Sequence, residues 1–206
     1  MKKVFIGCGV LAVLAIIVLI IVAIAGGSYN RLVKLGQGVD KQWADVQSVY
    51  QRRADLIPNL VKTVEGAANF EKSTLTEIAE ARASVGKLTI SPSQAPQTAA
   101  QLEEFQKAQG QLSSALSRLM SITENYPDLK ANANFRDLQA QLEGTENRIS
   151  VERGNFNTAV QGYNTAVKSF PAVFYAGMMG FKEKPYFAAA AGSEKAPAVQ
   201  FDMNKK

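Results

Sequence analysis

The residues in this chain that could do chemistry are charged side chains set among apolar ones. Arg53 stands where an apolar repeat would place a leucine, and Asp55 follows two positions later. Glu124, Glu146 and Arg148 lie on two later apolar segments. A buried charge is costly unless an opposite charge and hydrogen bonds accompany it. We therefore expect Arg53 and Asp55 to pair with Glu124 or Glu146 and so to fix how the segments align.

Two other interpretations of this charged set stay open, namely a site for a ligand or partner, and catalysis. The chain has no histidine, and its one cysteine, Cys8, lies within an apolar run. This composition excludes Ser-His-Asp and Cys-His arrangements. The glycines are scattered and form no phosphate-binding loop. We expect a protein that is not an enzyme and that holds no cofactor.

Carboxylates are the remaining candidates for a metal site. Helical bundles that hold two metal ions use Glu-x-x-His pairs, and a chain without histidine cannot supply them. An all-carboxylate site would need Glu71, Glu77 and Glu80, which their spacing otherwise places on a solvated helix face. We expect no metal to be bound.

The apolar run from Val4 to Ala25 contains no charged residue. As a helix it would be about 33 Å long, enough to cross the hydrocarbon layer of a bilayer. A cleaved signal peptide is the alternative, since Lys2 and Lys3 precede the run and Ala23-Ile24-Ala25 resembles a cleavage site. The run is longer than the apolar part of such signals, so we expect a single transmembrane anchor in contact with the lipid bilayer.

The net charge of +5 is too evenly distributed to indicate nucleic acid as a partner. Binding to nucleic acid needs a basic stripe or basic residues interleaved with aromatic ones, and neither is present. No polybasic block of the density that binds lipid headgroups is present either.

Apolar residues at intervals of three and four predict an all-α fold for the rest of the chain. Gly26-Gly27-Ser28 should separate the anchor (1–27) from an elongated antiparallel bundle (28–171) of three or four long helices. The first helix should kink or restart at Pro58 and weaken again at 66–69. Further helices are expected up to Lys87, over 102–123, and over 135–170, with Asn132–Asn134 capping the last. Residues 90–96 should form a loop, and Pro171 should end the last helix.

The final segment (172–206) changes character, because aromatic residues and methionines alternate with glycine and proline. We expect this tail to lie extended along the bundle and to cover an apolar groove. Residues 188–198 should be mobile, and Val199-Gln200-Phe201 should contact the bundle again. The asparagines at 155, 157 and 164 could bridge to neighbouring helices or to another subunit.

Several sequence blocks, in order, closely resemble the LemA family. The most specific is Arg52-Arg53-Ala54-Asp55-Leu56-Ile57-Pro58-Asn59-Leu60-Val61. The others are Tyr29-Asn30-Arg31-Leu32-Val33, Glu124-Asn125-Tyr126-Pro127-Asp128-Leu129-Lys130-Ala131 with Asn134-Phe135, Thr145-Glu146-Asn147-Arg148-Ile149, and Tyr163-Asn164. The family usually places a histidine before Glu71, whereas this chain has Phe70. This departure weakens any ligand or proton-relay role there.

The resemblance implies a single-pass membrane protein of bacterial type with an elongated helical bundle. Some members are associated with building intracellular membrane compartments, which suggests a role in membrane organisation. We expect a scaffold or interaction platform that forms homo-oligomers, with a compartment-forming protein and an enzyme or metal-binding bundle of unfamiliar type as the alternatives.

The expected location is the bacterial cytoplasmic (inner) membrane. Lysine and arginine flank the apolar run on both sides in nearly equal number, so the charge rule for orientation is almost undecided. The two lysines on a very short leading flank favour a bundle outside the cytoplasm.

Overall fold

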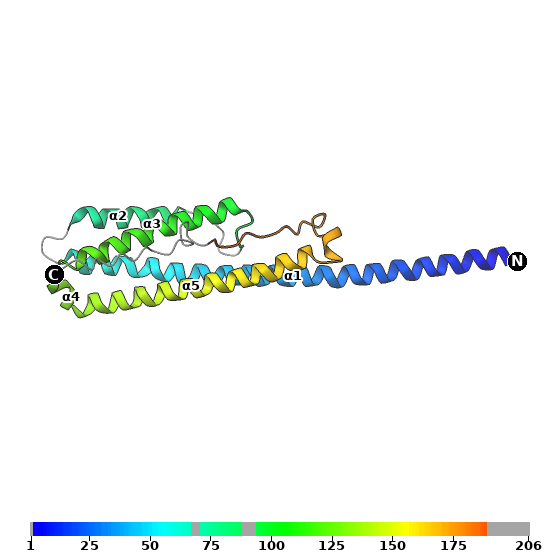
Figure 1. Ribbon diagram of the computed structural model, residues 1–206, viewed down its shortest axis with the longest axis horizontal. Coiled ribbons are helices and arrows are strands. Elements are labelled where there is room, and N and C mark those ends of the chain that lie inside the picture. The colour runs from blue at the N-terminus through cyan, green and yellow to red at the C-terminus, as the bar shows by residue number, and fades with distance from the viewer. Residues whose placement is uncertain (1, 67–70, 88–93, 189–206) are drawn as a thin grey trace, which may run out of the picture.

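The computed structural model describes residues 2–66, 71–87 and 94–188. Its helices are α1 (Lys2–Glu65), α2 (Lys72–Gly86), α3 (Ala99–Thr123), α4 (Pro127–Ala131) and α5 (Ala133–Lys168), followed by the single-turn 3₁₀ helix η1 (Ala172–Phe174). The described residues contain no strand, which confirms the predicted all-α fold. The molecule is a rod from which the N-terminal part of α1 projects alone (Figure 1).

Helix α1 has 64 residues and is therefore about 96 Å long. The predicted break at Gly26-Gly27-Ser28 is wrong, because α1 passes through these residues without interruption. A glycine inside a helix costs only about 1 kcal/mol relative to alanine. Two glycines do not interrupt a helix that is well formed on both sides. The apolar N-terminal segment and the bundle therefore share one continuous helix.

Pro58 lies inside α1 and does not start a new helix. Proline has no backbone N–H, so the carbonyl oxygen of Ala54, four residues earlier, loses its helical donor. Arg82 of α2 takes that place, since its Nε donates to the Ala54 carbonyl oxygen at 3.4 Å. The helix ends instead at Glu65, at the start of the predicted weak segment, of which residues 67–69 lie outside the described residues.

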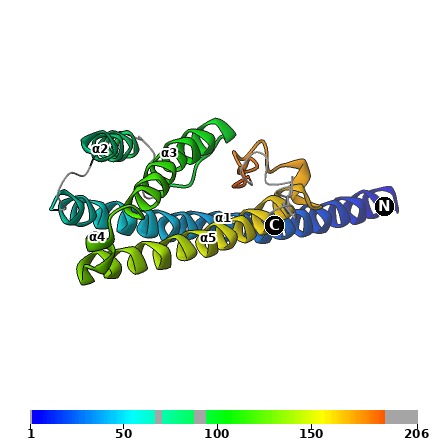
Figure 2. The ribbon, with the colours of Figure 1, turned by 60° about the vertical axis from the view of Figure 1, so that its left-hand side comes forward.

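The long helices α1 and α5 run antiparallel along the rod and lie side by side in both ribbon views (Figure 1 and Figure 2). Helices α2 and α3 form a second antiparallel pair beside them (Figure 1). The short α4 turns the chain from α3 into α5. The Asn132 side chain accepts hydrogen bonds from the amides of Asn134 and Phe135, which confirms the predicted cap of the last helix. Residues 94–98 precede α3 without helix, in agreement with the predicted loop, whose earlier part lies outside the described residues.

Buried apolar side chains form two separate cores along the rod. The proximal core lies nearer the projecting part of α1 and includes Leu32, Val39, Trp43, Val46, Tyr50, Leu102, Phe105, Ile149, Phe156, Val160, Tyr163 and Phe187. The distal core includes Ile57, Leu60, Val64, Ile78, Leu112, Leu116, Leu119, Leu129, Phe135 and Leu142. Between the two cores, α1, α3 and α5 present polar side chains.

We predict that the junction between the apolar N-terminal segment and the bundle is rigid. In a Cys8→Ala background, spin labels at Val22 and Ser48 should be separated by about 39 Å with a narrow distribution, because 26 residues of helix lie between them. Double electron–electron resonance on the full chain measures this distance. A pair at Asp137 and Gln161, within α5, is the control. A broad or much shorter distribution for the first pair alone would reveal a hinge at Gly26-Gly27.

Candidate functional site

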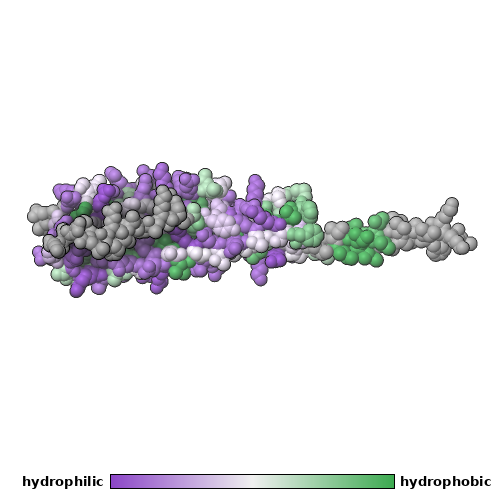
Figure 3. Space-filling view, viewed as in Figure 1, coloured by the Kyte–Doolittle hydropathy of each residue, from purple (hydrophilic) through white to green (hydrophobic). Residues whose placement is uncertain are grey.

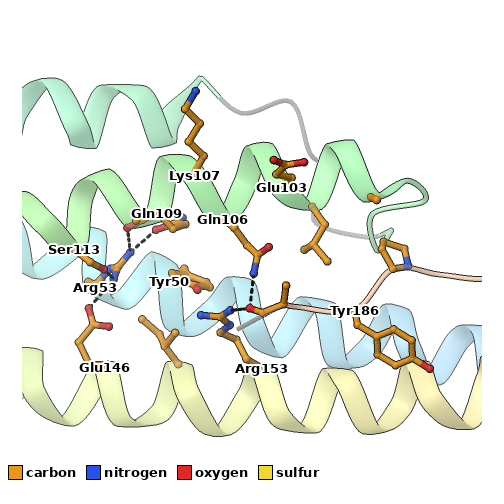
Figure 4. Close-up of a pocket in the computed structure, with 16 residues that line it drawn as sticks. Tyr50, Arg53, Glu103, Gln106, Lys107, Gln109, Ser113, Glu146, Arg153 and Tyr186 are labelled. Atoms are coloured by element: carbon orange, nitrogen blue, oxygen red, sulfur yellow. Dashed lines mark hydrogen bonds and ion pairs between the residues drawn. The ribbon is translucent and has the colours of Figure 1, made fainter. Parts of the chain in front are cut away.

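Arg53 occupies the boundary between the two cores, and its side chain is only 1% exposed. Its Nη1 donates to Glu146 Oε1 of α5 at 2.6 Å and to Ser113 Oγ of α3 at 2.8 Å. Its Nη2 donates to the Gln109 side-chain oxygen, also on α3. One guanidinium therefore joins three helices (Figure 4). We call Arg53, Gln109, Ser113 and Glu146 the polar layer.

The structure brings together only part of the predicted charged set. Arg53 meets Glu146, as expected from the sequence. Asp55 instead accepts a hydrogen bond from Gln51 on its own helix, and Glu124 pairs with Lys130 in the α3–α4 turn. Arg148 is exposed on α5. These three were wrongly expected in the network, because helical spacing identifies a face but not which of its edge residues points inward.

The other residues of the family-like blocks divide into structural and exposed positions. Ile57, Phe135, Tyr163 and Asn164 are buried, and Pro127 begins α4 directly after Tyr126. Tyr29 contacts the Phe181 ring edge-to-face, with 5.3 Å between ring centroids. Leu56 and Pro58 are half-buried, whereas Asn30, Arg52, Asn59, Glu71 and Asn147 are exposed.

Five aromatic rings from four segments meet in the proximal core. Phe187 of the tail stacks on Trp43 of α1 at 6.2 Å between centroids and meets Phe156 of α5 at 5.3 Å. The ring centroid of Phe105, on α3, lies 5.1 Å from that of Trp43 and 5.0 Å from that of Tyr50. Phe187 thus fills the space between α3 and α5 that neither helix fills itself.

Two asparagines on α5 hold the tail by its main chain. The Asn157 side chain donates to the carbonyl oxygen of Phe187 (3.1 Å) and accepts from its amide (2.8 Å). Asn164 makes the same pair of bonds, both 2.9 Å, to Lys184. Seven helical residues span about 10 Å, which matches three residues of an extended chain. Residues 182–188 thus run along the groove between α3 and α5, as expected for the tail, and we call them the strap.

The strap is also held by a largely buried ion pair that the sequence did not indicate. Lys184 Nζ lies 3.0 Å from Asp40 Oδ1, and the two side chains are 8% and 19% exposed. The same Asp40 oxygen accepts from the Ala95 amide, just before α3. Burial and, more weakly, the charge of Asp40 raise the pKa of the neighbouring Tyr163 hydroxyl. Lys184 and Asp40 are far apart in sequence, so no local spacing could have paired them.

Among the described residues, the groove between α3 and α5 continues beyond the strap as a cavity of about 670 Å³. Gln106 and Arg153 stand at its mouth, and both donate to the carbonyl oxygen of Ala188, the last described residue of the strap (Figure 4). A second cavity of about 680 Å³ continues past Ser113 and Glu146 towards Met120. The groove therefore extends along the line that the strap follows.

Titratable side chains line the wall of the groove. Burial raises the pKa of the Tyr50 hydroxyl in its wall, although the charges of Arg153 and Arg53 oppose that rise. The Ser113 hydroxyl accepts a hydrogen bond from Arg53 Nη1, which also donates to the Glu146 carboxylate. Of the suggested carboxylates, Glu77 pairs with Arg118, and Glu71 and Glu80 are exposed. The described part of the chain holds no cluster of three groups able to bind a metal ion.

Comparison with known proteins decides the family. The model of the LemA family matches residues 42–201, which cover most of the bundle, the polar layer and the strap. The chain belongs to the LemA family. It is 26% identical over 178 residues to the magnetosome protein MamQ of Magnetospirillum gryphiswaldense, and 25% identical to MamQ 2 of Paramagnetospirillum magneticum. Each of these alignments covers 77% of this chain and 64% of the relative.

This LemA-family chain also resembles protein LemA of Metamycoplasma hominis, at 21% identity over 144 residues, which covers 70% of this chain and 61% of that protein. It thus spans less than two thirds of the length of these relatives. Among the described residues, one helix, α1, contains a stretch long and apolar enough to cross a membrane. Its side chains from Val13 to Ile20 are exposed.

The polar layer yields an asymmetric prediction for stability. Arg53→Ala should lower the free energy of unfolding by about 3 kcal/mol, because it leaves a cavity and removes the donor to Gln109 and Ser113. The former partner Glu146 is 45% exposed and can be hydrated again, which limits the loss. Glu146→Ala should cost at least as much, since it leaves a fully buried guanidinium without a counter-charge. Urea unfolding measures both changes.

Glu143→Ala, on an exposed position one turn away in α5, should change the free energy of unfolding by less than about 0.5 kcal/mol. An unchanged stability in Arg53→Ala would contradict a buried polar layer.

The asparagine contacts predict how firmly the strap is held. Asn164→Leu removes both bonds to the Lys184 main chain, so the Lys184 amide should exchange with solvent deuterium at least about tenfold faster. Hydrogen exchange of the full chain measures this rate. Asn155→Leu is the matched control, because Asn155 is exposed and its side chain donates to Glu152 on its own helix. Equal protection in both variants would show that Asn164 does not hold the strap.

Proposed function

We propose that this chain is a non-enzymatic scaffold of the bacterial cytoplasmic membrane, held by its single apolar helix and able to bind extended protein segments in the groove between α3 and α5. The observation that carries the proposal is the strap. Its Lys184 and Phe187 are bound through their main-chain groups by Asn164 and Asn157. Binding through the main chain accepts many sequences, which suits an interaction platform.

We propose further that the segment bound in this groove can come from a second copy of the chain. The strap of a neighbour has the sequence that fits, with Phe187 for the aromatic cluster and Lys184 for Asp40. Two copies anchored in one bilayer hold their grooves at the same height, because α1 is continuous from the apolar segment to the bundle. Exchange of straps would therefore give homo-oligomers without any new surface.

A membrane-remodelling or compartment-forming oligomer is the second candidate. It is supported by the similarity to proteins named as magnetosome proteins in two organisms. It uses the same assembly, with many anchored copies acting together on the bilayer. For the orientation we propose that the bundle lies outside the cytoplasm, on the basis of Lys2 and Lys3 before the apolar run.

Strap exchange is tested with two differently tagged copies of the full chain, each with Cys8→Ala, expressed together. One carries Gln106→Cys and the other Ala188→Cys, which replace a hydrogen-bonded pair at the groove mouth. We expect a short bismaleimide to link the two tags in intact membranes. Glu104→Cys is the control for the first copy, since two residues place it about 200° around α3.

Each result of this experiment has a defined meaning. Mixed-tag products with Gln106→Cys and not with Glu104→Cys support exchange. Equal linking of both variants indicates self-assembly by another surface and contradicts exchange, and monomer alone contradicts self-assembly. Thin-section electron microscopy of the same overexpressing cells tests the second candidate, for which new vesicles or invaginations are expected and unchanged membranes would count against it.

A further inference from the structure

The segment between α5 and the strap displays its largest apolar side chains to the outside. Phe170, Phe174 and Met178 are 81%, 73% and 83% exposed, and Val173 and Met179 are at least half exposed. The small side chains of Ala172 and Ala176 are the buried ones. We call residues 170–181 the apolar loop. The expectation that its aromatic residues and methionines cover the bundle is wrong for Phe174, Met178 and Met179.

The apolar loop has a defined shape. The Ala176 amide donates to the Ala172 carbonyl oxygen at 2.8 Å, and the Phe181 amide donates to the Ala176 carbonyl oxygen at 2.9 Å. Gly180, at φ +83°, adopts the left-handed conformation that turns the chain back towards the strap. The exposed rings of Phe170 and Phe174 meet edge-to-face at 6.0 Å. The outward apolar face is therefore held by backbone bonds and is not a loose segment.

The apolar loop lies where α1 leaves the bundle. Phe181, at its end, contacts Tyr29 of α1. Only four helical residues, about 6 Å, separate Tyr29 from the end of the apolar run at Ala25. In the space-filling view apolar residues mark this end of the bundle, next to the projecting helix (Figure 3). The exposed apolar surface of the loop thus continues that of α1.

The surroundings of the loop are basic. Arg31 and Lys34 are exposed on α1 just beyond Tyr29, and Lys168 and Lys182 flank the loop on both sides. Glu183 is paired with Lys168 at 2.7 Å. Exposed apolar side chains bordered by lysine and arginine are typical of surfaces that enter the headgroup region of a membrane.

We propose that the apolar loop inserts into the headgroup layer of the bilayer that holds α1, so that the bundle stands on the membrane at two points. This inference rests on the proposed membrane anchor. We assign the bilayer as the partner of this apolar surface because of its position along α1. The headgroup layer extends several ångströms beyond the hydrocarbon layer, and α1 places the loop within that distance of the end of the apolar run. A second contact fixes the tilt and rotation of the rod, which one helix alone does not.

The test uses the full chain with Cys8→Ala in vesicles of phosphatidylcholine and phosphatidylglycerol at 3:1. An NBD fluorophore is attached to a single cysteine replacing Phe174 or Met178, and lipids carrying a doxyl quencher near the headgroup end of the acyl chain are added. We expect blue-shifted emission and at least twofold quenching at both positions. Ser114→Cys, exposed on α3 far from the loop, is the negative control, and Leu19→Cys in the apolar run reports on the anchor.

The outcomes separate the loop from the anchor. Quenching at Leu19, with Phe174 and Met178 behaving like Ser114, overturns the insertion of the loop and leaves the anchor intact. Absence of quenching at Leu19 overturns both. Blue-shifted emission at Phe174 without quenching by the doxyl lipids shows that protein covers the loop, and this also overturns the inference.

A second variant distinguishes insertion from a structural effect. Phe174→Asp places a charge on an exposed position, so the temperature of unfolding should not change. NBD at Met178 should nevertheless lose at least half of its quenching, because the charge resists entry into the headgroup layer. Unchanged quenching at Met178 in this variant would contradict the proposal.

Discussion

The buried guanidinium of Arg53 is the constraint on which the arrangement of the long helices depends. Apolar cores tolerate sliding, because a leucine displaced by one turn meets another apolar side chain. A buried charge tolerates none, since a shift of one turn, about 5.4 Å, would remove its acceptors. Arg53 finds Glu146, Gln109 and Ser113 at one height only. The polar layer thus fixes the register of α1, α3 and α5, and the two apolar cores add stability on either side.

The same register positions the aromatic cluster, the strap and the apolar loop, which all lie nearer the projecting part of α1. It brings Trp43, Phe105 and Phe156 to one height, so that a single side chain, Phe187, closes the proximal core. It also sets Asn157 and Asn164 along the groove where the strap runs. Because α1 continues without a break, the position of the apolar loop relative to the apolar run follows from the register as well.

The sequence predicted those features that depend on local pattern. Periodicity located the helices, Asn132 was recognised as a cap, and Glu146 was among the partners proposed for Arg53. Features that depend on which distant segments come into contact could not be predicted from the sequence. The acceptor role of the Ala54 carbonyl, freed by Pro58, becomes visible only when Arg82 is placed beside it. The prediction of a break at Gly26-Gly27 was wrong, because the low helix propensity of two glycines is a small energetic term in a helix of 64 residues.

Recognition of the strap combines two kinds of contact with different consequences. The side-chain amides of Asn157 and Asn164 bind only main-chain groups. Their seven-residue spacing on the helix matches two main-chain sites three residues apart in an extended segment. Phe187 and Lys184 supply the sequence dependence, one through ring contacts and the other through Asp40. A segment that lacks both side chains would keep four hydrogen bonds and lose its register. In the proposed scaffold, the groove would therefore hold its own strap firmly and bind other chains more weakly.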